Sequence, residues 1–119
     1  MARSALRLWA PVVLWAAAIF AFSSVPDLGT GLGTWDFVLR KLAHALEFAV
    51  LGLLLARALG RAGVAFALGA LYAVSDEIHQ SFVPGRAASL RDVLLDSAGV
   101  AAGVLCWLLV TQRRQRRTA

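Results

Sequence analysis

Cysteine and charged residues are scarce in this chain of 119 residues. The single cysteine, Cys106, excludes a disulfide framework and a thiolate metal cluster, and its place inside an apolar run predicts a buried packing residue. Charged residues make up only 16% of the chain, whereas hydrophobic residues make up 60%. A soluble domain of this size cannot bury so much apolar surface, so the composition predicts a protein whose solvent is lipid.

Acidic residues are also few, seven against twelve basic ones, which gives a formal net charge of +5. Such a charge can indicate nucleic-acid binding, but the chain has no basic helix with interleaved aromatic residues, and its basic residues flank apolar runs. We therefore expect no nucleic-acid partner. The sequence shows no internal repeat and no second domain, so we expect residues 1–119 to form a single transmembrane domain.

Four apolar segments approach the ~20 residues that a helix needs to cross a hydrocarbon core of about 30 Å. They cover residues of about 8–23, 41–60, 62–81 and 91–110. Each should be a helix, because an isolated strand cannot satisfy its backbone in lipid. The first could instead be a signal peptide, since Arg3 and Arg7 precede it, but Trp9 and Trp15 favour a retained helix. The predicted fold class is all-α, an integral membrane bundle of four helices.

Basic residues predict the orientation of this bundle. Eight of the twelve lie at the N-terminus, between the second and third segments, or at the C-terminus, namely Arg3, Arg7, Arg57, Arg61, Arg113, Arg114, Arg116 and Arg117. The positive-inside rule makes these regions cytoplasmic, so we expect both termini inside the cell. All seven acidic residues lie toward the other, outer side: Asp27, Asp36, Glu47, Asp76, Glu77, Asp92 and Asp96.

Ionisable residues of three predicted helices share one depth near the outer side. With a rise of 1.5 Å per residue, His44 and Glu47 lie about 5–9 Å below the outer surface. Asp76, Glu77 and Asp96 lie about 6–8 Å below it. Ionisable groups at membrane depth are costly, which makes them functional candidates by default. A purely structural hydrogen-bond network is the alternative interpretation.

Helical phase indicates that this polar layer faces inward. Asp96 lies on one stripe with Gly99 and Gly103, a small-xxx-small pair that allows a neighbouring backbone to approach closely. Lys41 and His44 share one face of their own helix. We therefore expect these ionisable side chains to converge inside the bundle.

The layer contains candidates for catalysis and for binding. Carboxylates beside a histidine can act as general acid and base, so His44, Asp76 and Glu77 are the catalytic candidates. The binding candidates are Lys41, Glu47, Gln80, Arg86, Asp92 and Asp96.

Arg86 is the candidate for binding an anion. It follows a Pro-Gly turn and precedes a helix N-terminus, where a lipid phosphate would find free backbone N–H groups. An ion pair of Arg86 with Asp92 or Glu77 is the alternative. Asp92 also lies three residues after Ser89, the spacing of a capping box, so capping the fourth helix would explain it as well.

A divalent metal is a further candidate ligand. His44 and Glu47, at H-x-x-E spacing, could bind it together with Asp76 and His79, although such spacings often arise by chance. His79 has a simpler interpretation as a residue of the membrane interface. The sequence therefore leaves the cofactor open.

Three motifs, two of which contain these residues, carry a resemblance to a known family. "FSS" at Phe22–Ser24 begins it, and "KLAHALEFAVLGLLL" continues it with a K-x-x-H-x-x-x-(aromatic)-x-x-L-G pattern. "DEIHQSFVPGRAASLRDVLLDSAG" adds a D-E-x-x-Q-x-F-x-P-G-R block, followed by Asp and then Asn or Asp before Gly. With these motifs the chain resembles the VanZ-like family of small bacterial membrane proteins over essentially its whole length. The chain departs from the family pattern at two positions. Arg40 stands where an acidic residue is frequent, and Asp96 stands where Asn is frequent, so the charge of the site changes.

The resemblance implies a role in the cell envelope, because one type of family member is associated with low-level teicoplanin resistance. The resemblance also implies that the protein is located in the bacterial cytoplasmic membrane. Together with the outward-facing polar layer, the resemblance predicts a protein that binds or modifies an anionic lipid-linked cell-wall component. Its partners would be membrane lipids, and its function would be linked to glycopeptide tolerance. Whether the protein is an enzyme stays open. The alternatives are a non-enzymatic binding or accessory protein and a small proton-coupled carrier, which would have to be a homo-oligomer because four helices make a thin pathway.

Overall fold

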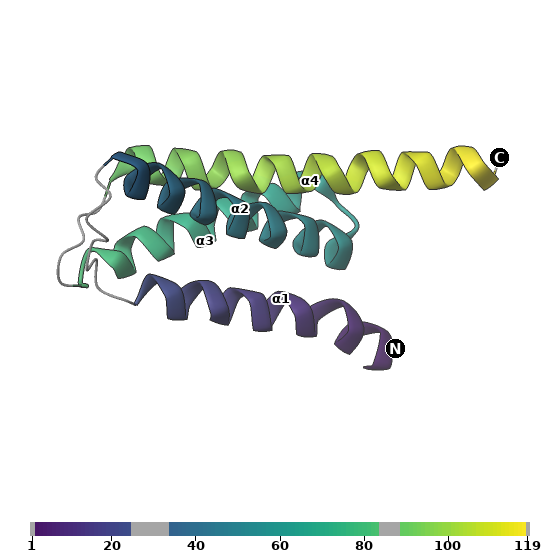
Figure 1. Ribbon diagram of the computed structural model, residues 1–119. Helices are drawn as coiled ribbons and strands as arrows, with labels where there is room; N and C mark the ends of the chain where they lie inside the picture. The colour runs from purple at the N-terminus through teal and green to yellow at the C-terminus, as the bar shows by residue number, and fades with distance from the viewer. Residues whose placement is uncertain (1, 25–33, 84–88, 119) are drawn as a thin grey trace.

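The computed structural model describes residues 2–24, 34–83 and 89–118. These residues form four α-helices, which confirms the predicted all-α class. Their bounds are α1 Ala2–Ser23, α2 Thr34–Leu59, α3 Ala62–Gln80 and α4 Leu90–Thr118. Successive helices run in opposite directions, so that both ends of the chain and the turn between α2 and α3 lie toward one end of the bundle (Figure 1). We call this the terminal end, and we call the other end the polar end.

Two helices are longer than the apolar segments that predict them. α2 begins at Thr34 rather than near residue 41, and α4 continues to Thr118, through the basic "RRQRR" run. Arg and Gln are good helix formers, so a helix can continue past its apolar part into water. Hydropathy therefore predicts the part of each helix that can lie in lipid. It does not predict where the helix begins or ends.

Three of the four helices are long and apolar enough to cross a membrane: Ala5–Ser23, Val38–Leu59 and Leu90–Thr118. α3 is not among them, because its last turns carry Asp76, Glu77 and His79 within only 19 residues. The polar end of α3 is instead covered by the other helices, since Asp76 and Glu77 are buried. Insertion of all four helices and the cytoplasmic side of the termini stay predictions.

Glycines bring α2 and α4 into close contact. A Cβ atom added at Gly99 or Gly103 would come closer than 3.0 Å to the carbonyl oxygens of Ala45 and Ala49, respectively. The predicted small-xxx-small pair is therefore confirmed as a packing surface. This contact fixes the spacing of the two helices that carry His44 and the acidic residues of α4.

The apolar core lies where α2, α3 and α4 meet. Phe48 and Leu51 of α2 are buried beside Val100 of α4. The Val100 side chain occupies the space that a Cβ atom at Gly69 of α3 would need, so these two helices also pack closely.

α1 joins the bundle through two hydrogen bonds from side chains to backbone. The indole Nε1–H of Trp15 donates to the carbonyl oxygen of Glu47 on α2 at 2.8 Å. The hydroxyl of Tyr72 on α3 donates to the carbonyl oxygen of Ala16 at 2.5 Å. Both bonds satisfy polar groups that would otherwise face an apolar environment.

The prediction that Cys106 is buried was wrong, because the residue is exposed on α4. It lies beside Leu105 and Leu109, which are exposed as well. In a bundle whose solvent is lipid, the outer face is as apolar as the core, so hydropathy alone cannot tell the two faces apart.

Candidate functional site

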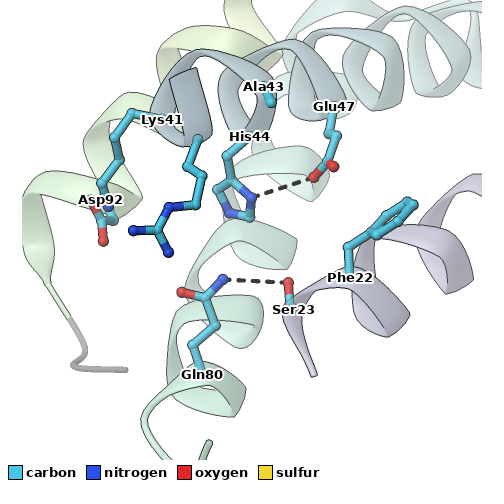
Figure 2. A pocket seen from close by; sticks show the side chains of 9 residues that line it. Phe22, Ser23, Lys41, Ala43, His44, Glu47, Gln80 and Asp92 are labelled. Carbon is cyan, nitrogen blue, oxygen red and sulfur yellow. Dashed lines mark hydrogen bonds and ion pairs between the residues drawn. The ribbon is translucent and has the colours of Figure 1, made fainter. Parts of the chain in front are cut away.

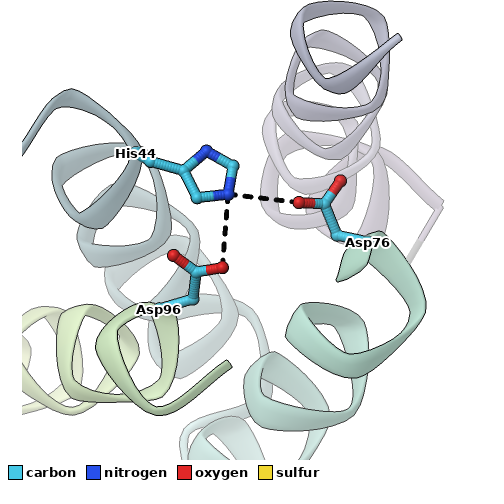
Figure 3. Close-up of side chains that lie close together, drawn as sticks. All are labelled: His44, Asp76 and Asp96. Carbon is cyan, nitrogen blue, oxygen red and sulfur yellow. Dashed lines mark ion pairs between the residues drawn. The ribbon is translucent and has the colours of Figure 1, made fainter. Parts of the chain in front are cut away.

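His44 of α2 lies between two buried carboxylates at the polar end. Its Nε2 atom is 3.2 Å from Asp76 Oδ2 on α3 and 3.2 Å from Asp96 Oδ2 on α4 (Figure 3). The Asp76 and Asp96 side chains are 1% and 0% exposed. Three helices thus contribute one ionisable side chain each to a single point, which we call the His44 centre (His44, Asp76 and Asp96).

Glu47 occupies the other side of the imidazole ring. It lies one turn after His44 on α2, and its Oε2 atom is 3.4 Å from His44 Nδ1 (Figure 2). Glu47 is partly exposed, at 22%, so it connects the buried centre to the surface. Both ring nitrogens of His44 therefore face carboxylate oxygens, which fixes the orientation of the ring.

The buried carboxylates of the centre keep unused acceptor atoms. Within the described part of the chain, no group donates a hydrogen bond to Asp76 Oδ1 or to either oxygen of Asp96. The contacts of His44 Nε2 with Asp76 and Asp96 are within ion-pair distance. Buried polar atoms normally have partners, and water or a cation can supply them at this centre.

Gln80 and Ser23 extend the centre to α1. The Gln80 amide donates to Asp76 Oδ2 at 3.3 Å and to the Ser23 hydroxyl at 3.4 Å. Ser23 is only 1% exposed. The sequence predicts Gln80 as a binding candidate but not Ser23, although the "FSS" motif contains it and is the signal that could have revealed it.

Lys41 and Asp92 form an ion pair between α2 and α4 at the mouth of the site. Lys41 Nζ is 2.5 Å from Asp92 Oδ1, with side chains 32% and 14% exposed. Asp92 thus links α4 to α2 through this ion pair. Its role in capping α4 stays a prediction. Both residues keep their place among the binding candidates, since the pair lies beside the His44 centre (Figure 2).

Glu77 is buried but faces a different neighbour. Its Oε1 atom accepts a hydrogen bond of 2.7 Å from the backbone N–H of Ser89, next to the start of α4. A carboxylate at a helix N-terminus is favourable for the free N–H groups and for the helix dipole. This contact favours a role for Glu77 in holding α4, whereas its predicted catalytic role stays a prediction.

His79 does not join His44 in a metal-binding group. Its ring stacks on Phe20 of α1, with the centroids 4.2 Å apart, and its Nε2 atom is 2.9 Å from the Ser24 hydroxyl. Among the described residues, the group that could hold a metal ion consists of His44, Asp76 and Asp96. This group contains His44 and Asp76 of the predicted set together with Asp96, whereas His79 and Glu47 are not part of it.

Arg86 lies outside the described residues. Its predicted convergence with His44 and its predicted contact with an anion therefore stay predictions.

A pocket of about 280 Å³ opens beside the His44 centre. Figure 2 shows its lining side chains, which come from α1, α2, α3 and α4. They are Phe22, Ser23, Arg40, Lys41, Ala43, His44, Glu47, Gln80 and Asp92. The pocket combines an apolar wall with two basic residues, Arg40 and Lys41, and two acidic ones, Glu47 and Asp92.

A family model described as VanZ/LLP1 matches residues 8–111, which is most of the chain. The chain belongs to the VanZ/LLP1 family. This membership confirms the resemblance drawn from the three motifs, and the matched region contains all four helices in whole or in large part. Comparisons with curated proteins and with solved structures give no match.

The family match and the three apolar helices together indicate a membrane protein. In this VanZ/LLP1 chain, the motifs "KLAH" and "DEIHQ" provide residues of both the pocket and the His44 centre. The site thus places an imidazole and carboxylates, the groups that general acid–base chemistry uses, beside a pocket.

Proposed function

We propose that this VanZ/LLP1 protein binds the anionic headgroup of a lipid-linked cell-wall component in the pocket at the polar end of the bundle. The observation that carries the proposal is the presence of Arg40 and Lys41 in a pocket whose other wall includes Phe22 and Ala43. Basic side chains would bind phosphate oxygens, while the apolar wall would receive the first part of the lipid chain.

The position of the pocket along the helices supports a lipid ligand. Arg40 and Lys41 lie near the start of the apolar segment Val38–Leu59, so they would stand close to the boundary between headgroups and hydrocarbon. A volume of about 280 Å³ is at the lower end for ligand pockets, which suits a headgroup rather than a whole lipid.

The proposal includes the place of the protein in the cell. The basic residues of the terminal end favour the cytoplasmic face, so the pocket would open to the outer face of the bacterial cytoplasmic membrane. Family membership points to a membrane protein associated with glycopeptide resistance. Binding of a lipid-linked precursor on the outer face would connect the pocket to that process, because glycopeptides act on cell-wall precursors there.

The test compares two arginines of α2 that lie at opposite ends of the helix. Arg40→Gln removes a charge from the pocket, and Arg57→Gln removes one from the exposed terminal end as the matched control. A hydrogen bond to a charged group contributes about 1.5–3 kcal/mol, so Arg40→Gln should weaken binding by about tenfold or more. Binding of a lipid-linked precursor to the full chain in nanodiscs, measured by native mass spectrometry, reads out the difference.

Equal binding by the wild type and both variants would refute the pocket as the binding site. Turnover of the labelled precursor in the same samples would favour an enzyme, with His44 and Asp76 as the acid–base pair. Binding without turnover would favour a binding or accessory protein. A proton-coupled carrier would need a homo-oligomer, whose mass the same spectra would show.

A further inference from the structure

We propose that His44, Asp76 and Asp96 bind a divalent transition-metal ion at the polar end of the bundle. Each of these residues offers one ligand atom, and the three atoms lie within 4.8 Å of one another. Imidazole nitrogen and carboxylate oxygen are usual ligands for Zn²⁺ and related ions. The three ligands come from three helices, so an ion would tie α2, α3 and α4 together.

The two distances from His44 Nε2 agree with shared coordination. Two ligands bound to one ion at 2.0–2.2 Å stand roughly 2.8–3.6 Å apart in four- to six-coordinate geometry. His44 Nε2 is 3.2 Å from an oxygen of Asp76 and 3.2 Å from an oxygen of Asp96.

Burial of Asp96 is the second, independent observation. Its side chain is 0% exposed, and neither of its oxygens accepts a hydrogen bond from any described residue. Asp76 Oδ1 likewise accepts no hydrogen bond from a described residue, and the Asp76 side chain is 1% exposed. A buried carboxylate oxygen without a hydrogen-bond donor is unfavourable, and coordination of a cation would satisfy these atoms.

The surroundings of the three ligands resemble the outer shell of metal sites. A metal-binding histidine usually directs its other ring nitrogen to a carboxylate or a carbonyl oxygen. Glu47 Oε2 stands 3.4 Å from His44 Nδ1, on the side of the ring opposite Asp76 and Asp96. Gln80 donates to Asp76 Oδ2 and so orients that ligand as well.

Charge and ligand type favour one class of ion. A divalent cation, a neutral imidazole and two carboxylates have a net charge of zero, which is the least costly state at membrane depth. One nitrogen with two carboxylates suits Zn²⁺ or Mn²⁺, whereas Ca²⁺ takes six to eight oxygen ligands. We therefore expect Mg²⁺ and Ca²⁺ not to compete.

Zn²⁺ binding to the full chain tests the site. The protein is purified in detergent without a histidine tag, stripped with a chelator and titrated against a chromogenic Zn²⁺ indicator. We expect one ion per chain, a loss of affinity of more than about 100-fold in Asp96→Asn, and a loss of about 10- to 100-fold in Glu47→Gln. His79→Ala, which changes the second histidine of the chain, should bind like the wild type.

X-ray absorption of the Zn²⁺-loaded wild type tests the same site without any variant. We expect one imidazole among nitrogen and oxygen neighbours, and no sulfur. Unchanged affinity in Asp96→Asn, an equal loss in His79→Ala, or a sulfur neighbour from Cys106 would overturn the proposal. Arg40→Gln should keep full Zn²⁺ affinity, so failure of the metal site and failure of lipid binding can be told apart.

Discussion

Near the turn between α2 and α3, the buried positions of the bundle are apolar and include Ala56 and Ala65. Toward the polar end, the same three-helix core buries Asp76 and Asp96 beside His44. The terminal end shows that these helices can pack through apolar and small residues alone. Burying the ionisable residues of the polar end carries a cost that apolar residues avoid, and the proposed ligand would offset that cost.

Removing His44 should produce the largest loss of stability at the polar end. His44→Ala leaves two buried carboxylates facing each other, and breaking a buried ion pair costs about 3–5 kcal/mol. His79→Ala is the matched control, because that ring lies apart from the His44 centre and stacks on Phe20 of α1. Unfolding by SDS titration in mixed micelles measures both. If His44→Ala lowers the free energy of unfolding no more than His79→Ala does, the buried ionisable residues do not set the polar end apart from the terminal end.

A smaller loss is expected from filling the contact between α2 and α4. A Cβ atom at Gly103 would meet backbone atoms of Ala49 and Leu53, so Gly103→Ala should cost about 1–3 kcal/mol. Gly63 of α3 has nothing within 4 Å of such an atom, and Gly63→Ala should be neutral or slightly stabilising. The same titration compares the two variants. Equal effects would mean that close approach of the helices does not determine their packing.

The sequence predicts much of this contrast, because depth along a helix follows directly from residue number. The rise per residue places His44, Asp76 and Asp96 in one layer, and the structure brings all three together. The glycine pair of α4 was also predicted from its spacing alone. Both inferences need only local geometry.

Direction around a helix was harder to predict. Neighbouring residues differ by about 100°, so Asp76 reaches His44 while Glu77 reaches Ser89 at the start of α4. The sequence treats these two acids as equivalent. Cys106 shows the same limit, since an apolar run in a membrane protein gives no contrast between its inner and outer faces.

The most direct test of the account replaces the His44 centre with apolar residues of similar size, as His44→Leu, Asp76→Val and Asp96→Val in one chain. Replacing a buried ion cluster by packed apolar residues is often neutral or stabilising, by up to about 4 kcal/mol. If the His44 centre serves a ligand rather than the fold, the free energy of unfolding of this variant in mixed micelles equals or exceeds that of the wild type. A loss of several kcal/mol would contradict it and assign the His44 centre to the fold.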